Sequence, residues 1–216
     1  MRFLGAQATQ RSGSDVNGKG VAVKRVFVAT HNEHKIREIG EILGGFEIVA
    51  DNPEGVEETA PDFAGNALIK VRAIAARHPG EWCMADDSGL EVAFLGGEPG
   101  VRSARYSEPA EAEGKTRAQL NNEKLLAKLR GVADRRANFT CAIALTDPSG
   151  GEHLAEGRCF GRIAQAPSGK DGFGYDPLFV PDGCEKTFAE LEPAEKNAMS
   201  HRGRALEKAV GIILAF

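Results

Sequence analysis

The chain has 216 residues, of which 42% are hydrophobic and 27% are charged, and its formal net charge at pH 7 is −4. These values are typical of a soluble protein with one domain and a substantial core. They argue against a broad nucleic-acid-binding face, and no apolar run approaches the ~20 residues of a membrane-spanning helix. We therefore expect a cytoplasmic protein that binds neither a membrane nor, directly, a nucleic acid.

The first 22 residues differ in composition from the rest of the chain. They place basic residues among Gly, Ser, Gln and Asn, and they contain neither an apolar stretch nor a small-residue cleavage site. This composition is typical of a disordered tail and unlike a secretory signal. We predict a disordered tail over 1–22 and a single domain over 23–216. The four cysteines are widely spaced without a CxxC pair, which favours reduced thiols over disulfides.

The first half of the chain alternates strand and helix patterns. The apolar run 26–29 predicts a strand, and a helical pattern follows the polar turn 30–32 as far as the glycines 44–45. A second helix fits 63–77 and ends at a His-Pro-Gly sequence. A second buried strand fits 82–85 and runs into an Asp-Asp-Ser-Gly sequence.

The second half adds an antiparallel pair. A charged amphipathic helix fits 116–129, and the runs 139–145 and 154–163 resemble paired strands separated by an Asp-Pro-Ser-Gly-Gly turn. A glycine-rich loop at 168–175 precedes a short apolar run, and one helix over about 195–214 closes the chain. Alternating strands and helices that include a hairpin predict an α/β fold with a mixed sheet.

The turn from Thr30 to Lys35 joins the first strand to the first helix. Free backbone N–H groups and the helix dipole favour an anion there, and Lys35 adds a positive charge one turn into the helix. The alternative is ordinary capping by Thr30 or Asn32 with a solvated lysine. The turn is not a Walker A loop, because GxxxxGK[ST] is absent.

Acidic residues form two pairs, Glu57-Glu58 and Asp86-Asp87. Two adjacent aspartates in an extended chain face opposite ways, so that one can anchor the chain while the other points into a cleft. Carboxylate oxygens suit Mg²⁺, which binds through one or two carboxylates together with substrate phosphates. The alternative is an Asp-Ser-Gly turn in which the aspartate caps and the glycine adopts a positive φ.

The segment 172–177 places Phe173 and Tyr175 among glycines. Glycines let the backbone approach a ligand closely, so an aromatic face becomes available for stacking on a nucleobase. The alternative is a tight turn whose aromatic rings fill the core.

The segment 195–204 is rich in hydrogen-bond donors. Lys196, Ser200 and Arg204 fall near one face at helical spacing, and His201 and Arg202 add two further donors. The alternative is the solvated start of a basic helix. Together with the acidic pairs and the aromatic loop, these cations predict a phosphate-handling α/β enzyme.

Several separated segments resemble the Ham1, or inosine triphosphate pyrophosphatase, family. They are 28–35, 57–59, 66–70, 85–90, 96–106, 172–177 and 195–203. The resemblance runs from about residue 26 to the C-terminus. It implies an elongated mixed β-sheet flanked by helices, with two lobes around a central substrate groove, and a homodimer. It also implies Mg²⁺-dependent hydrolysis of ITP, dITP and XTP to the monophosphate and pyrophosphate, which keeps these nucleotides out of DNA and RNA.

The resemblance assigns roles to individual residues. It makes Asp87 the candidate general base and pairs it with Glu57 as a metal ligand. The substrate-binding residues that it implies are Thr30, His31, Asn32, Glu33, His34, Lys35, Lys70, Ser88, Phe173, Gly174, Tyr175, Asp176, Lys196, His201 and Arg202. One departure concerns Gly65, where many relatives carry a glutamate, so Glu57, Glu58 or Asp86 would have to compensate.

The choice of base has a chemical logic. Hypoxanthine and xanthine present a 6-oxo acceptor beside an N1–H donor, and adenine presents the reverse. Asp176 can accept from N1–H while His201, Arg202 or a backbone amide donates to O6, so adenine would leave buried groups unpaired. Guanine shares this edge and must be rejected elsewhere. Two alternatives stay open: a Maf-like pyrophosphatase of different base specificity, and a non-catalytic nucleotide-binding protein.

Overall fold

The structure, a computed structural model, describes residues 24–107 and 114–216, so the predicted tail over 1–22 lies outside the described residues. A six-stranded sheet with the order β2-β1-β3-β4-β5-β6 organises it. The strands are β1 (Arg25–Val28), β2 (Glu47–Ala50), β3 (Trp82–Val92), β4 (Arg136–Thr146), β5 (Glu152–Ile163) and β6 (Phe179–Pro181). The first three are parallel and the others antiparallel, which confirms the predicted mixed sheet and hairpin.

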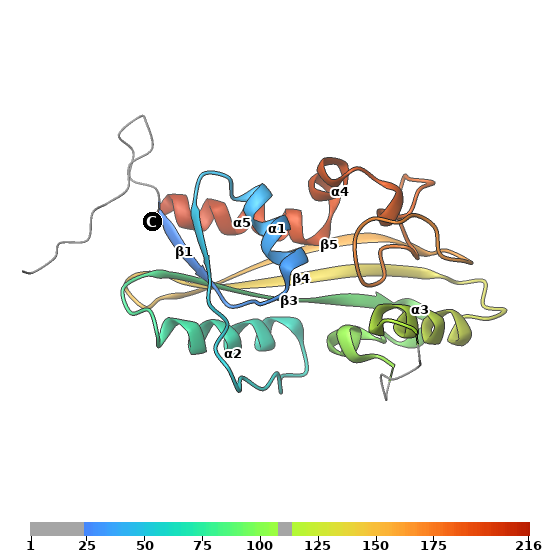
Figure 1. Ribbon diagram of the computed structural model, residues 1–216, viewed down its shortest axis with the longest axis horizontal. Helices are drawn as coiled ribbons and strands as arrows, with labels where there is room; N and C mark the ends of the chain where they lie inside the picture. The colour runs from blue at the N-terminus through green and yellow to red at the C-terminus, as the bar shows by residue number, and fades with distance from the viewer. Residues whose placement is uncertain (1–23, 108–113) are drawn as a thin grey trace, which may run out of the picture.

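Helices cover both faces of this elongated sheet (Figure 1). The helices are α1 (Glu33–Ile42), α2 (Phe63–Ala75), α3 (Arg117–Lys128), α4 (Pro193–Met199) and α5 (His201–Ala215), with 3-10 turns η1 (Ala93–Leu95), η2 (Gly100–Arg105) and η3 (Phe188–Glu190). In Figure 1, α1, α4 and α5 lie above the long strands, and α2 and α3 lie below them at opposite ends. None of the described helices has the length and apolar character that spanning a membrane requires.

Alternation along β3 explains why both faces are covered. Trp82 and Met84 belong to the core cluster that includes residues of α5, whereas Cys83 and Ala85 belong to the cluster that includes residues of α2. Successive side chains of a strand point to opposite faces, so this strand supplies apolar groups to two layers. A third cluster fills the far end of the sheet around α3 and η3.

The sheet has a topological switch point at the end of β1. The chain leaves β1 toward β2 on one side and returns through α2 to β3 on the other. β1 ends at Val28, opposite Met84, but β3 continues to Val92. In open α/β sheets, ligands bind at the carboxyl ends of strands at such a point. The fold therefore marks the edge of β3 beyond Met84 as a binding position.

Two sequence predictions about element ends were wrong. The strand predicted over 82–85 continues through Asp86-Asp87-Ser88-Gly89, because β4 pairs with it from Cys83 to Val92. The single closing helix is two helices, because Ser200 takes an extended conformation and its side chain accepts a hydrogen bond from the N–H of Gly203 as the cap of α5. Arg204 consequently does not share a face with Lys196; its guanidinium donates to the carbonyl of Arg158.

Gly89→Ala should lower the free energy of unfolding by about 2 kcal/mol, because the added Cβ overpacks a filled position. That Cβ would lie 2.4 Å from Oγ of Ser103 and 2.5 Å from the carbonyl oxygen of Gly100. Urea unfolding checks this. Gly45→Ala is the matched control, because nothing lies within 4 Å of its Cβ position. Equal stability of the two variants would contradict the packing argument.

Candidate active site

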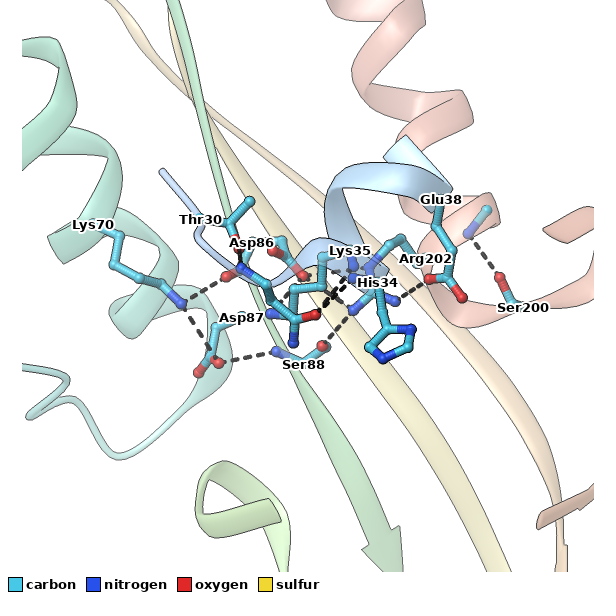
Figure 2. A network of polar contacts seen from close by, with 12 residues as sticks. Thr30, His34, Lys35, Glu38, Lys70, Asp86, Asp87, Ser88, Ser200 and Arg202 are labelled. Atoms are coloured by element: carbon cyan, nitrogen blue, oxygen red, sulfur yellow. Dashed lines mark hydrogen bonds and ion pairs between the residues drawn. The ribbon is translucent and has the colours of Figure 1, made fainter. Parts of the chain in front are cut away.

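A cavity of about 330 Å³ opens at the switch point. Its lining comes from the turn after β1, the start of α1, helix α2, the middle of β3, η2, the loop 173–176 and the neighbouring ends of α4 and α5. Segments far apart in the chain thus meet at one place. Figure 2 shows the polar core of this meeting point, with Lys70 on one side of β3 and Arg202 on the other.

The turn after β1 has features of both alternatives considered from the sequence, a capped helix start and a cation at a binding site. Oδ1 of Asn32 accepts hydrogen bonds from the backbone N–H groups of His34 (3.0 Å) and Lys35 (3.3 Å), so it caps α1. Oγ1 of Thr30 accepts from the N–H of Asn32 at 3.1 Å. Lys35 lines the cavity, and its Nζ lies 3.0 Å from Oδ2 of Asp86. The helix start is capped and still presents a cation to the cavity.

Asp86 is a buried anion with fixed partners. Its side chain is 2% exposed, and Oδ2 lies 3.0 Å from Nζ of Lys35 and 3.2 Å from Nη2 of Arg202. Burial alone would raise the pKa of this carboxyl, but the charges of Lys35, Arg202 and Lys70 outweigh burial and hold the pKa well below its ordinary value. Asp86 therefore stays ionised and positions the surrounding cations.

Asp87 lies on the opposite face of β3 in a different environment. Nδ2 of Asn66 donates to its Oδ2 at 3.1 Å, the N–H of Ser88 donates to Oδ1 at 3.0 Å, and Nζ of Lys70 lies 3.7 Å from Oδ1. Burial raises the pKa of Asp87; Lys70 opposes this effect and the nearby carboxylate of Glu58 adds to it. A cavity-lining carboxyl with a raised pKa has the properties of a general base.

The loop 173–176 is fixed to the body by buried contacts. Oδ2 of Asp176 accepts from the N–H of Phe173 and from Nζ of Lys196, both at 2.8 Å. Burial raises the pKa of Asp176, although the charge of Lys196 opposes it. The hydroxyl of Tyr175 donates to the carbonyl of Ser103 at 3.0 Å. Tyr175 is itself in the core, so Phe173 is the more exposed ring of the loop.

His201 is a buried neutral imidazole beside this loop. Its side chain stacks on Phe139, with ring centroids 4.7 Å apart and planes at 12°. Burial, reinforced by the charges of Arg202 and Lys196, holds the pKa of His201 well below its ordinary value. Nδ1 is buried and has no hydrogen-bond partner among the described residues. A neutral imidazole can donate from one nitrogen and accept at the other, which suits the recognition of a polar ligand edge.

Glu38 links the two sides of the site and was missed in the sequence analysis. Its carboxylate accepts from Nζ of Lys196 at 2.8 Å and from Nη1 of Arg202. Burial alone would raise the pKa of Glu38, but Arg202 and Lys196 lower it. The available signal was spacing, since a residue three positions after Lys35 lies on the same face of α1.

Most of the predicted site residues line this cavity. They are Thr30, His31, Asn32, Lys35, Lys70, Asp87, Ser88, Phe173, Gly174, Tyr175, Asp176, Lys196, His201 and Arg202. Glu33, His34 and Glu57 are exposed and lie outside the lining. Glu58 lines the cavity in place of Glu57, because Nζ of Lys70 holds the Glu58 carboxylate at 2.8 Å. Of the two adjacent glutamates, Glu58 therefore lies at the cavity, and a metal-binding role for either one stays a prediction.

Comparison with known proteins decides the relationship. The model of the Ham1 family matches residues 26–212. The chain belongs to the Ham1 family. A Ham1 relative from Clostridium perfringens, named dITP/XTP pyrophosphatase, is 45% identical over 199 residues, covering 86% of this chain and 95% of the relative.

Solved Ham1 structures share the fold. The Ham1 protein of Staphylococcus aureus is 36% identical, with a TM-score of 0.76 over 89% of this chain and 99% of that protein. A nucleoside-triphosphatase, or dITP/XTP pyrophosphatase, from Mycobacterium abscessus is 44% identical, with a TM-score of 0.66 over 86% of this chain and 98% of that protein. These matches confirm the predicted α/β architecture.

Close packing explains why residue 65 is a glycine in this Ham1 chain. Its N–H donates to Oδ1 of the capping Asp62 at 2.7 Å, and a Cβ at this position would lie 2.5 Å from Cβ of Ala60. A larger residue would therefore displace the loop that precedes α2. The loop also provides the N–H of Ala60, which donates to Oδ1 of Asn66 and orients that amide toward Asp87.

Proposed function

We propose that this protein hydrolyses the non-standard purine nucleotides ITP, dITP and XTP to the monophosphate and pyrophosphate, and so keeps them out of DNA and RNA. One observation carries the proposal. A single cavity combines cations at a helix start, a carboxylate with a raised pKa, and an aromatic loop with buried polar groups. The names of the Ham1 relatives support the same reaction.

The cationic side of the cavity would bind the triphosphate. The N-terminus of α1 provides a positive dipole end, and Lys35 and Lys70 line the cavity on the two sides of β3. These groups would neutralise the charge that develops on the departing pyrophosphate. Nζ of Lys35 lies 3.0 Å from Oδ2 of Asp86, and Nζ of Lys70 lies 2.8 Å from Oε1 of Glu58, so carboxylates position both lysines at the cavity.

Asp87 would act on the attacking water. The amide of Asn66 and the N–H of Ser88 fix the orientation of its carboxylate. In the proposed step Asp87 accepts a proton from water, the water oxygen bonds to the α-phosphorus, and the bond to the pyrophosphate oxygen breaks. The products are the nucleoside monophosphate and pyrophosphate.

We also propose Mg²⁺ as the cofactor, held by Glu58 and Asp87. No group of three or more His, Cys, Asp or Glu side chains within 24–107 and 114–216 forms a metal site. Two carboxylates on one cavity fit a cation that completes its coordination with water and substrate phosphates. Bound Mg²⁺ would supply Lewis-acid neutralisation of phosphate charge.

Base selection would rest on Asp176 and His201. Oδ2 of Asp176 already accepts two hydrogen bonds, so Oδ1 is the oxygen that we assign to the N1–H of hypoxanthine or xanthine. The neutral imidazole of His201 would donate to O6. Adenine presents the opposite pattern and would leave both groups unpaired, which a buried site penalises strongly.

The first test is pyrophosphate release from ITP, XTP, dITP, ATP, GTP and a pyrimidine triphosphate, with Mg²⁺ and with EDTA. We expect fast, metal-dependent release from the first three and far slower release from the others. Orthophosphate as the product would contradict the proposed bond cleavage. Fastest turnover of the pyrimidine nucleotide would favour the Maf-like alternative, and nucleotide binding without turnover would favour the non-catalytic one.

A homodimer is also part of the proposal and rests on the resemblance, whereas the proposed cytoplasmic location rests on the composition of the sequence. Light scattering on the purified protein tests the homodimer. A mass close to the 23.0 kDa of one chain would contradict the dimer.

A further inference from the structure

One ring contact connects the phosphate side of the site to its base side. The imidazole of His34, in the first turn of α1, stacks on Phe173 with ring centroids 5.1 Å apart and planes at 16°. Phe173 lines the cavity, whereas His34 does not. Figure 2 shows the His34 ring extending away from the start of α1, where Lys35 is directed toward Asp86. The position of His34 thus indicates a role other than direct binding of phosphate.

The backbone of the base-side loop is already fixed without His34. Nδ2 of Asn122, in α3, donates to the carbonyl of Gly174 at 3.1 Å, and Tyr175 and Asp176 are held by the buried contacts described above. The direction of the Phe173 ring is a separate variable, because these contacts hold the backbone and the neighbouring side chains and not the ring itself. A side chain that must be ordered on binding costs affinity.

Two buried cations lie near the ring of Phe173. Nζ of Lys196 and Cζ of Arg202, both buried and both lining the cavity, lie 5.0 and 5.7 Å from its centroid. His34 is exposed, and Nη2 of Arg37 lies 3.4 Å from its Nδ1. His34 therefore contacts Phe173 while remaining exposed and outside the cavity lining.

We propose that His34 is a positioning residue for the purine. Its imidazole supports one face of Phe173, so that the ring is already oriented when a base stacks on the cavity side. The inference rests on the proposed function and deepens it, because it gives the phosphate-binding turn a part in base recognition. An aromatic pair of this geometry contributes about 0.5–1.5 kcal/mol, a factor of roughly 2 to 12 in affinity.

The test is a double-mutant cycle between His34 and Phe173. It measures the Kd of dITP by calorimetry in EDTA, and KM and kcat with Mg²⁺, for the wild type, His34→Ala, Phe173→Ala and the double variant. His34→Ala should raise Kd and KM about five-fold and change kcat less than about two-fold. In the Phe173→Ala background the same change should have no effect. His34→Phe, which keeps a stacking ring, should restore wild-type affinity.

Inhibition by tripolyphosphate separates this role from phosphate binding, because this inhibitor has no base. His34→Ala should leave its Ki unchanged, whereas Lys35→Ala should raise it. A raised Ki in His34→Ala, an equal effect of His34→Ala with and without Phe173, or tighter dITP binding by His34→Ala would each overturn the proposal. If the wild type binds dITP without hydrolysing it, the proposed function is contradicted, but the Kd values of the cycle still test the role of His34. A wild type that does not bind dITP would overturn both.

Discussion

Asp87→Asn should reduce kcat for dITP about 1,000-fold, because an asparagine cannot accept the proton of the attacking water. The substitution keeps the size of the side chain, and its amide oxygen can still accept the hydrogen bond from Asn66. Binding of dITP in EDTA should therefore persist within about ten-fold. Pyrophosphate release at saturating dITP, together with thermal unfolding, separates loss of chemistry from loss of folding.

The neighbouring residue provides the matched control. Asp86 lies on the same strand, but its carboxylate binds Lys35 and Arg202 instead of facing Asn66. Asp86→Asn leaves buried cations undercompensated and should lower the free energy of unfolding by about 3 kcal/mol. Asp87→Asn should destabilise the protein much less. Full turnover by Asp87→Asn would remove this residue from the chemistry, and equal stability losses in both variants would contradict their separate roles.

The fold could be predicted where local sequence patterns determine it. The strand–turn–helix opening and the β4–β5 hairpin follow from apolar periodicity and from turn residues that are close in sequence. The length of β3 does not, because its second half is specified by pairing with β4 about fifty residues later. The sequence pattern therefore placed Asp86 and Asp87 at the end of a strand, although they lie in its middle. The break between α4 and α5 at Ser200 could have been predicted, because serine is a favoured N-cap residue.

The site could be predicted as a set of residue types and only partly as a set of contacts. Motif residues on separate segments do meet at one cavity, as the resemblance implied. Glu38 and Asn66 were missed as site residues because polar side chains on helices read as solvated until the tertiary structure buries them. Whether Glu57 or Glu58 points into the cavity depends on side-chain directions in an irregular segment, which the sequence does not specify. In the structure, Nζ of Lys70 donates a hydrogen bond to Glu58 and so holds that carboxylate at the cavity.

The second large effect concerns the buried guanidinium of Arg202. Its side chain is 2% exposed and donates to Glu38, to Asp86 and, at 2.9 Å, to Oγ of Ser88. Arg202→Met should fill much of the same volume without the charge and leave two buried carboxylates with fewer cations. We expect a loss of about 3 kcal/mol in the free energy of unfolding at neutral pH. Arg204→Met, two residues later on the surface of the same helix, should change it by no more than about 0.5 kcal/mol.

The pH dependence of the stability lost in Arg202→Met shows whether that loss is electrostatic in origin. Burial alone would raise the folded-state pKa values of Glu38 and Asp86. The neighbouring cations outweigh burial and lower both values from the ordinary 4.5 and 3.8. The stabilisation from these groups is therefore fully present above those ordinary values and is lost as pH falls through the lower folded-state values. Without Arg202 both folded-state pKa values rise, so the variant has less stability to lose on acidification. Urea unfolding at about pH 7 and about pH 3.5 should show the gap between wild type and Arg202→Met narrowing at the lower pH. A gap of constant size would mean that Arg202 stabilises the protein by packing, and that Glu38 and Asp86 are not the groups it holds ionised.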